Sequence, residues 1–195
     1  MRLAGQPSWS MAIDEPHNLL VALFVRDAAG LRPDTDPVIP ALTPAVATNQ
    51  TLAAAAGLAA SIQWAGWWAR LLDADHLTPT ATPPDLPELA DSPELQEVLR
   101  TRYPDAIRWS ASRKREYVTL MTGSNRPSVE GDVVREIERS LGRTAQPFEL
   151  RITVLPVSGI HAWRVRPQHL VVTRALFTDT TTYRMRLHTI IEGLA

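Results

Sequence analysis

The stretch at residues 51–72, TLAAAAGLAASIQWAGWWARLL, constrains the fold more than any other part of the chain. Its first half consists almost entirely of small residues, and alanine has the highest helix propensity of any residue. The second half places large apolar residues at the i, i+3, i+4, i+7, i+8 spacing of one helical face. They are Trp64, Trp67, Trp68, Leu71 and Leu72. The pattern predicts a long helix whose tryptophan face lies in the protein core.

A second apolar stripe follows the same stretch, on Leu58, Ile62, Ala65 and Ala69. A helix that is apolar on nearly all sides is either buried or spans a membrane. A spanning helix needs about 20 predominantly apolar residues, whereas Ser61, Gln63 and Arg70 interrupt this one. We therefore expect a central core helix and no contact with a membrane. A helix whose tryptophans complete the surface of a partner is the alternative.

The composition is that of a globular protein with a hydrophobic core. Of the 195 residues, 45% are hydrophobic, and a chain of this length forms one domain by default. The absence of cysteine excludes disulfides and thiolate metal sites. Because no secretory signal begins the chain, we expect a cytoplasmic protein that starts at Met1 or Met11. Arginine outnumbers lysine 19 to 1, a bias typical of GC-rich bacterial genomes.

Charge is distributed unequally between the two halves of the chain. Residues 1–99 contain 4 basic and 12 acidic side chains, a net charge of −8, whereas residues 100–195 contain 16 basic and 9 acidic side chains, a net charge of +7. The halves could neutralise each other within the molecule. Alternatively, the basic half could bind an acidic partner.

Helix start and stop signals predict further helices at about residues 14–29, 94–102, 104–121 and 129–141. Within the third of these, the segment 108–121 is either helical or partly a strand, because Tyr117, Val118 and Thr119 favour strands. Four prolines make residues 31–47 an extended surface segment. A second proline-rich segment, residues 73–91, is the best candidate for a long loop or linker.

The last 48 residues predict an antiparallel three-stranded meander. Residues 148–154 alternate apolar and polar side chains with the period of a strand. Ser158-Gly159 is typical of a hairpin loop, and a second turn at Pro167-Gln168 leads into a third strand. Asp179 then begins a closing helix with a stripe of apolar residues. The whole pattern predicts a single α+β domain over residues 1–195; a boundary in the loop would instead separate a helical region, 1–75, from an α+β region, 92–195.

The predicted meander carries a cationic surface on the side opposite its apolar face. It consists of Arg151, Arg164, Arg166 and His169. The predicted register places Arg151 directly opposite Arg166, and like charges in that position repel unless an anion lies between them. The surface is therefore a candidate site for an acidic protein or a phosphate. Neutralisation by the acidic segment 129–141 or by solvent is the simpler alternative.

A second basic cluster lies in the middle of the chain, interleaved with aromatic residues. Its candidate binding residues are Arg108, Arg113, Lys114 and Arg115. Basic residues beside aromatic ones can bind nucleic acid, but no nucleic-acid-binding motif surrounds them. An ordinary solvated helix face explains the cluster equally well.

Catalytic signals are weak. Asp73, Asp75 and His76 bring two carboxylates near an imidazole, as an acid–base pair or a metal site would require. The sequence contains no phosphate-binding loop, dinucleotide fingerprint or nucleophile elbow, so we expect no cofactor and no bound metal. The leading hypothesis is a non-catalytic protein-interaction module that binds an acidic protein through its arginine-rich sheet face. The alternatives are a nucleic-acid-binding protein and a hydrolase-like enzyme built from dispersed histidines and aspartates.

Overall fold

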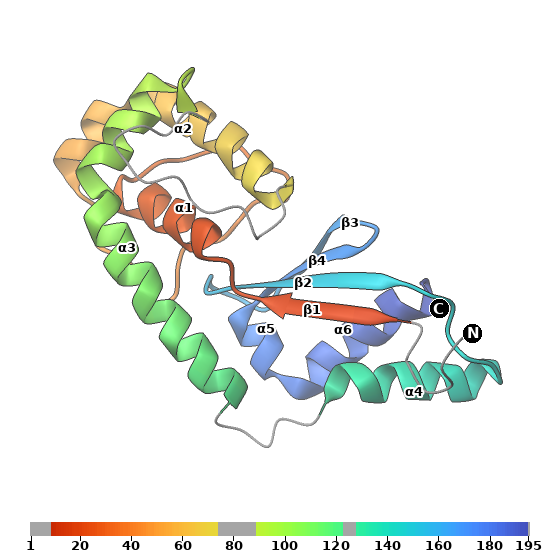
Figure 1. Ribbon diagram of the computed structural model, residues 1–195. Coiled ribbons are helices and arrows are strands. Elements are labelled where there is room, and N and C mark those ends of the chain that lie inside the picture. Colours follow the sequence, from red (N-terminus) through yellow and green to blue (C-terminus); the bar gives the residue numbers. More distant parts are fainter. Residues whose placement is uncertain (1–8, 74–88, 123–127, 195) are drawn as a thin grey trace, which may run out of the picture. The chain divides into compact units, whose positions relative to one another are not determined.

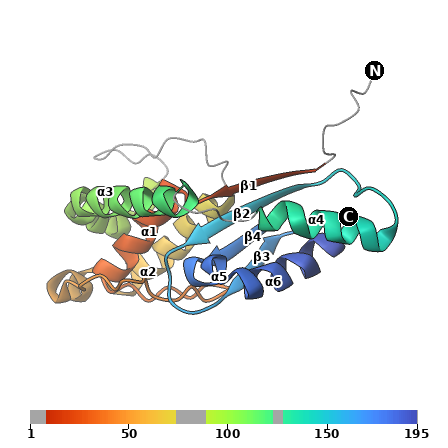
Figure 2. The same cartoon turned by 90° about the horizontal axis from the view of Figure 1, so that it is seen from below.

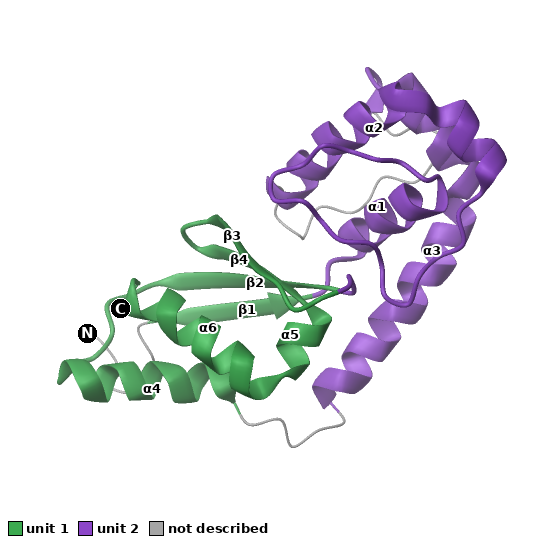
Figure 3. Cartoon of the chain, turned by 180° about the vertical axis from the view of Figure 1, so that it is seen from behind, with its two compact units in different colours: residues 1–14, 123–155, 159–195 green, residues 15–122, 156–158 purple. Residues whose placement is uncertain are grey.

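The computed structural model describes residues 9–73, 89–122 and 128–194, and it confirms the α+β class. Within these ranges it contains six helices and one four-stranded sheet (Figure 1). The chain divides into two compact units (Figure 3): unit 1 comprises residues 1–14, 123–155 and 159–195, and unit 2 comprises residues 15–122 and 156–158. The single domain stays a prediction, and most of the proline-rich segment 73–91 lies outside the described residues.

Unit 2 is built on the helices α1 (His17–Ala28), α2 (Gln50–Asp73) and α3 (Pro93–Thr122). The predicted end of α1 before Gly30 is confirmed, because Gly30 has a φ of +62° that side-chain-bearing residues rarely adopt. A Cβ atom at Gly30 would also lie 3.0 Å from the Cβ of Ala53 and 3.0 Å from Cγ2 of Thr48. Glycine therefore ends α1 and lets the first turn of α2 approach it.

The long central helix is confirmed, with a kink at Gly57, where φ is 63° and ψ is −166°. Its tryptophan face is buried: the Trp64 indole N–H donates to the Ala22 carbonyl of α1 at 2.8 Å, and the Trp64 ring stacks on Trp68. The second stripe is not buried, since Leu58 and Ile62 are 73% and 64% exposed. Only one face of α2 belongs to the core, because α1 and α3 both pack against that face.

Helix α3 runs without interruption through Pro104, where the sequence predicted two separate helices. Proline removes one helical hydrogen bond, but buried residues on both sides of it, including Leu99 and Ala106, keep the helix packed against α1 and α2. The segment 108–121 is helical throughout. Packing along the whole length of α3 therefore overrides the local cost of one proline.

Side-chain bonds fix the proline-rich segment 31–47 to α1. The buried Arg26 lies 2.6 Å from the Asp27 carboxylate and donates to the carbonyls of Ile39 at 2.9 Å and Pro40 at 2.7 Å. The other carboxylate oxygen of Asp27 accepts the backbone N–H of Leu42 at 2.7 Å. These bonds replace the backbone pairing that a segment rich in proline cannot form.

The sheet of unit 1 has the strand order β1-β2-β4-β3, formed by Ser10–Asp14 (β1), Glu149–Leu155 (β2), Ala162–Arg166 (β3) and His169–Thr173 (β4). The predicted meander is wrong in its pairing: β2 is parallel to β1 and to β4, and β3 pairs antiparallel with β4 alone among the described strands. Strand β1 was not predicted. Met11 lies within β1, opposite Leu150 of β2.

The reason for the different pairing lies in the connection after β2. Residues 156–158 do not turn back along β2; Val157 instead forms a bridge with Leu42, and the Pro156 carbonyl accepts the N–H of Thr43. The hairpin at Pro167-Gln168 is confirmed, and next to the turn Arg166 pairs with His169, as the predicted register requires. A bulge between Arg164 and Arg166 then shifts the register by one residue, so that Trp163 pairs with Val171 rather than with the predicted Val172. Strand β4 therefore occupies the place next to β2 that the sequence assigned to β3.

Three helices lie on one side of the sheet (Figures 1 and 2): α4 (Val129–Leu141), α5 (Arg174–Thr178) and α6 (Thr180–Glu192). The predicted helix 129–141 and the closing helix are both confirmed. Asp179 begins α6 by accepting hydrogen bonds from the backbone N–H and the hydroxyl of Thr182. Both bonds lower the pKa of Asp179, and the bond from the hydroxyl has the larger effect. The Tyr183 hydroxyl of α6 donates to Glu130 of α4 at 3.0 Å.

None of the helices in these ranges is both long and apolar enough to cross a bilayer.

Candidate functional site

The predicted cationic surface of the sheet is rearranged by the strand order. Arg151 on β2 and Arg166 on β3 each have His169 of β4 as their cross-strand partner, so they do not face each other as predicted. Arg164 is paired with Leu170 in the next position of the register. The structure therefore brings Arg151, His169 and Arg166 into one row across three strands and separates Arg164 from that row.

The centre of this row is an interior position rather than a binding surface. His169 is buried, and its Nε2 lies 2.9 Å from the hydroxyl oxygen of Thr153, which is also buried. Arg151 is half-buried. Arg164 and Arg166 on β3 are the exposed members of the predicted set.

Strand β3 is an edge strand whose exposed side chains are the arginines Arg164 and Arg166. The Arg164 guanidinium donates to the Pro167 carbonyl through Nε at 3.1 Å and Nη2 at 2.7 Å, which fixes it beside the hairpin turn. Just before the strand, Ile160 is 56% exposed and the ring of His161 stacks on Trp163 with centroids 5.3 Å apart. We name the set Ile160, His161, Trp163, Arg164 and Arg166 the β3 edge.

The second basic cluster lies on α3, and neighbouring groups already engage most of it. Arg108 pairs with Asp105, and Arg113 pairs with Glu116 while lying over the Trp109 ring. The Lys114 ammonium donates to the Glu15 carbonyl at 2.9 Å and lies 5.3 Å from the centroid of the Tyr117 ring. The side chain of Arg115 is exposed and makes no ion pair within the residues that the structure describes. These contacts favour a structural role for Arg113, whereas the side chain of Arg108 remains 73% exposed.

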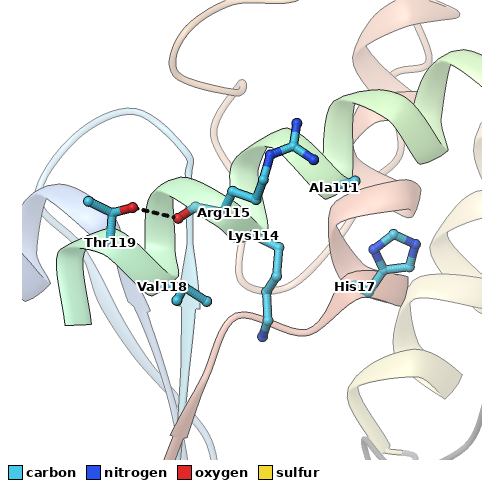
Figure 4. A pocket seen from close by; sticks show the side chains of 6 residues that line it. All are labelled: His17, Ala111, Lys114, Arg115, Val118 and Thr119. Carbon is cyan, nitrogen blue, oxygen red and sulfur yellow. Dashed lines mark hydrogen bonds between the residues drawn. The ribbon is translucent and has the colours of Figure 1, made fainter. Parts of the chain in front are cut away.

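Lys114 and Arg115 also line a pocket that the sequence did not indicate (Figure 4). The pocket has a volume of about 610 Å³, and its other lining residues are His17, Ala111, Val118 and Thr119. His17 is half-buried at the start of α1, with Nε2 3.5 Å from the hydroxyl of Ser110. His17 and Lys114 are far apart in the sequence and carry no shared motif, so only the packing of α1 on α3 reveals the pair.

Burial lowers the pKa of His17 below its ordinary value of 6.5, and the positive charge of Lys114 lowers it further. The protonated imidazole would lose hydration in the pocket and would be repelled by the ammonium group. Above its lowered pKa, His17 is therefore neutral in the folded protein.

This pKa predicts that unit 2 loses stability as the pH falls below about 6.5, where the unfolded chain protonates His17 more readily than the folded chain does. The loss ends once the pH passes below the lowered pKa of the folded state. His17→Gln should remove this part of the pH dependence. Urea unfolding of both proteins at about pH 7.5 and about pH 5.5 measures it; an equal loss of stability in the two proteins would contradict the prediction.

The weak acid–base candidate is placed only in part. Asp73 is the last residue of α2, whereas Asp75 and His76 lie outside the described residues. Within the described ranges, no three histidine or acidic side chains come close enough together to hold a metal ion.

Comparison with known proteins adds no assignment: no family model, no curated protein and no solved structure matches this chain.

Proposed function

We propose that this protein is a protein-interaction module in which an acidic, extended segment of a partner binds along the β3 edge. The observation that supports this most directly is the exposure of Arg164 and Arg166 on a strand at the edge of the sheet. An extended segment adds to such an edge through backbone hydrogen bonds, and side chains at alternate positions supply the specificity.

The charges on β3 select among possible partners. Arginines, a bulge and a short length are the features by which natural edge strands avoid pairing with copies of themselves, and β3 has all three over its five residues. Two β3 edges would bring like charges together, whereas glutamates or aspartates on a partner strand would pair with the guanidinium groups. An acidic partner is therefore favoured over a second copy.

The remaining residues of the β3 edge supply apolar contact. Ile160 and His161 are exposed, and the His161 ring stacks on the half-buried Trp163 ring, which the alternation of a strand places on the opposite face from Arg164. Aromatic residues and arginine are enriched in protein interfaces. A segment that alternates acidic and aliphatic side chains fits this arrangement best.

The test uses a labelled peptide of alternating glutamate and valine, with fluorescence anisotropy for affinity and backbone amide NMR shifts for location. We expect shifts on β3, and at least a tenfold loss of affinity in the double variant R164E/R166E. Arg186→Glu, an exposed change on α6, is the matched control and should bind normally. A proline in the middle of the peptide removes a backbone donor and should also weaken binding.

Two outcomes would overturn the proposal. One is unchanged affinity in R164E/R166E, with circular dichroism confirming that this variant is folded. The other is a lysine–valine peptide, or a DNA duplex with a steep salt dependence, that binds better than the acidic peptide; the DNA result would favour the nucleic-acid alternative.

A further inference from the structure

The pocket on α3 and the start of α1 is independent of the β3 edge and has the size of a small-molecule site. Its volume of about 610 Å³ falls within the range of about 300–1,000 Å³ that ligand pockets occupy. Every lining residue belongs to unit 2. The packing of α1 against α3 therefore forms the pocket within a single compact unit.

The polar groups of the lining favour negative charge. Lys114, Arg115 and His17 all carry nitrogen donors, and the lining contains no carboxylate side chain. The Glu15 carbonyl and the Tyr117 ring hold the Lys114 ammonium in place. A fixed ammonium loses little conformational entropy when an anion binds, which is the general advantage of a preorganised site.

The other part of the lining is apolar. Ala111 and Val118 lie on the same face of α3 as Lys114, one turn before and one turn after it, and Val118 is 47% exposed. In Figure 4, Val118, Lys114 and His17 lie on one side of α3, whereas the Arg115 guanidinium points away from them. A ligand with one charged end and one apolar end matches this division.

We propose that this pocket binds a small organic anion, a carboxylate or a phosphate ester, whose charged oxygens contact Lys114 and His17 and whose apolar part lies on Ala111 and Val118. The bound anion offsets the repulsion between the ammonium and a protonated imidazole, so binding is accompanied by protonation of His17. The other charged groups around His17 are Arg115 of α3 and the buried Glu15 that precedes α1.

The test compares four probes by NMR titration: benzoate, phenyl phosphate, inorganic phosphate and benzyl alcohol. We expect the two aromatic anions to bind at least tenfold more tightly than inorganic phosphate, which lacks an apolar part, and benzyl alcohol, which lacks a charge. The stronger of the two aromatic anions then distinguishes a carboxylate site from a phosphate site. Equal binding of benzyl alcohol, or no binding of either aromatic anion, would overturn the proposal.

Two variants locate the binding. Lys114→Gln should weaken benzoate binding at least tenfold at every pH, whereas Arg108→Gln, which changes a nearby cation outside the pocket, should not. Affinity for benzoate should rise several-fold as the pH falls from about 7.5 to about 5.5, and His17→Gln should abolish this rise. If the folded Lys114→Gln and His17→Gln variants both bind as the wild type does, the anion lies elsewhere and the proposal is wrong. Because R164E/R166E should bind benzoate normally, failure here is distinct from failure at the β3 edge.

Discussion

Replacement of Arg26 by alanine should lower the free energy of unfolding of unit 2 by about 3–5 kcal/mol, the range observed when one partner is removed from a buried ion pair. Arg26 is only 5% exposed, and its guanidinium contacts the Asp27 carboxylate and the carbonyls of Ile39 and Pro40. The alanine variant leaves all three acceptors without that donor in a site that remains shielded from water. Arg26→Lys should recover only part of the loss, since one ammonium cannot reproduce a planar fork of donors.

Urea unfolding followed by tryptophan fluorescence measures this effect, because four of the six tryptophans, Trp64, Trp67, Trp68 and Trp109, lie in unit 2. Arg32→Ala is the matched control: it removes an exposed arginine from the segment that Arg26 anchors, and it should change stability by less than about 0.5 kcal/mol. A loss below about 1 kcal/mol in Arg26→Ala would mean that segment 31–47 holds its position without this side chain.

The role of Arg26 could not be predicted from the sequence, although the extended form of the segment that it anchors could be. Four prolines predict that residues 31–47 form neither a helix nor a central strand, and that prediction needs only local chemistry. The side chain that anchors the segment cannot be found in the same way. Arg26 and Asp27 appear in the sequence as charges that follow the apolar run 19–25, and their partners lie 13 to 15 residues further along the chain.

Helices were predictable because their signals are local. The apolar spacing of 17–28, 50–73, 129–141 and 180–192 lies within the helices, and end signals such as Gly30 and Asp179 lie within two residues of their ends. Pro104 is the exception, since the packing of α3 against α1 and α2 decides whether the helix continues. Packing also decides which side of α2 is buried. Apolar character alone predicted burial for Leu58, but the structure leaves this side chain in solvent.

The sheet was predictable in its strands but not in their order. Alternation identifies a strand and its two faces, yet any apolar face can pair with any other, so the pattern does not determine which strands are neighbours. Insertion of β4 between β2 and β3 is accompanied by the bridge between Leu42 and Val157, a contact between distant parts of the chain. The candidate sites also depend on contacts between distant parts of the chain. Strand order determines the exposure of Arg164, and the packing of α1 against α3 brings His17 and Lys114 into one pocket.

Replacement of Trp64 by alanine is the second change with a large expected effect, a loss of about 3–5 kcal/mol in the stability of unit 2. Trp64 is fully buried, stacks on Trp68 with ring centroids 5.2 Å apart, and lies 5.7 Å from the Arg26 guanidinium carbon. Alanine would leave a cavity that the surrounding helices can fill only in part. Urea unfolding followed by circular dichroism at helical wavelengths measures the loss without relying on the deleted fluorophore.

A matched pair of phenylalanine variants separates packing from hydrogen bonding at this face. Trp64 donates its indole N–H to Ala22, whereas the buried Nε1 of Trp67 has no hydrogen-bond partner within the described residues. Trp64→Phe should therefore cost about 1 kcal/mol more than Trp67→Phe, the net contribution of one hydrogen bond; the reverse order would contradict the assigned roles. Unchanged peptide binding in the folded Trp67→Phe variant would show that the buried tryptophan face takes no part in recognition, as the proposal for the β3 edge requires.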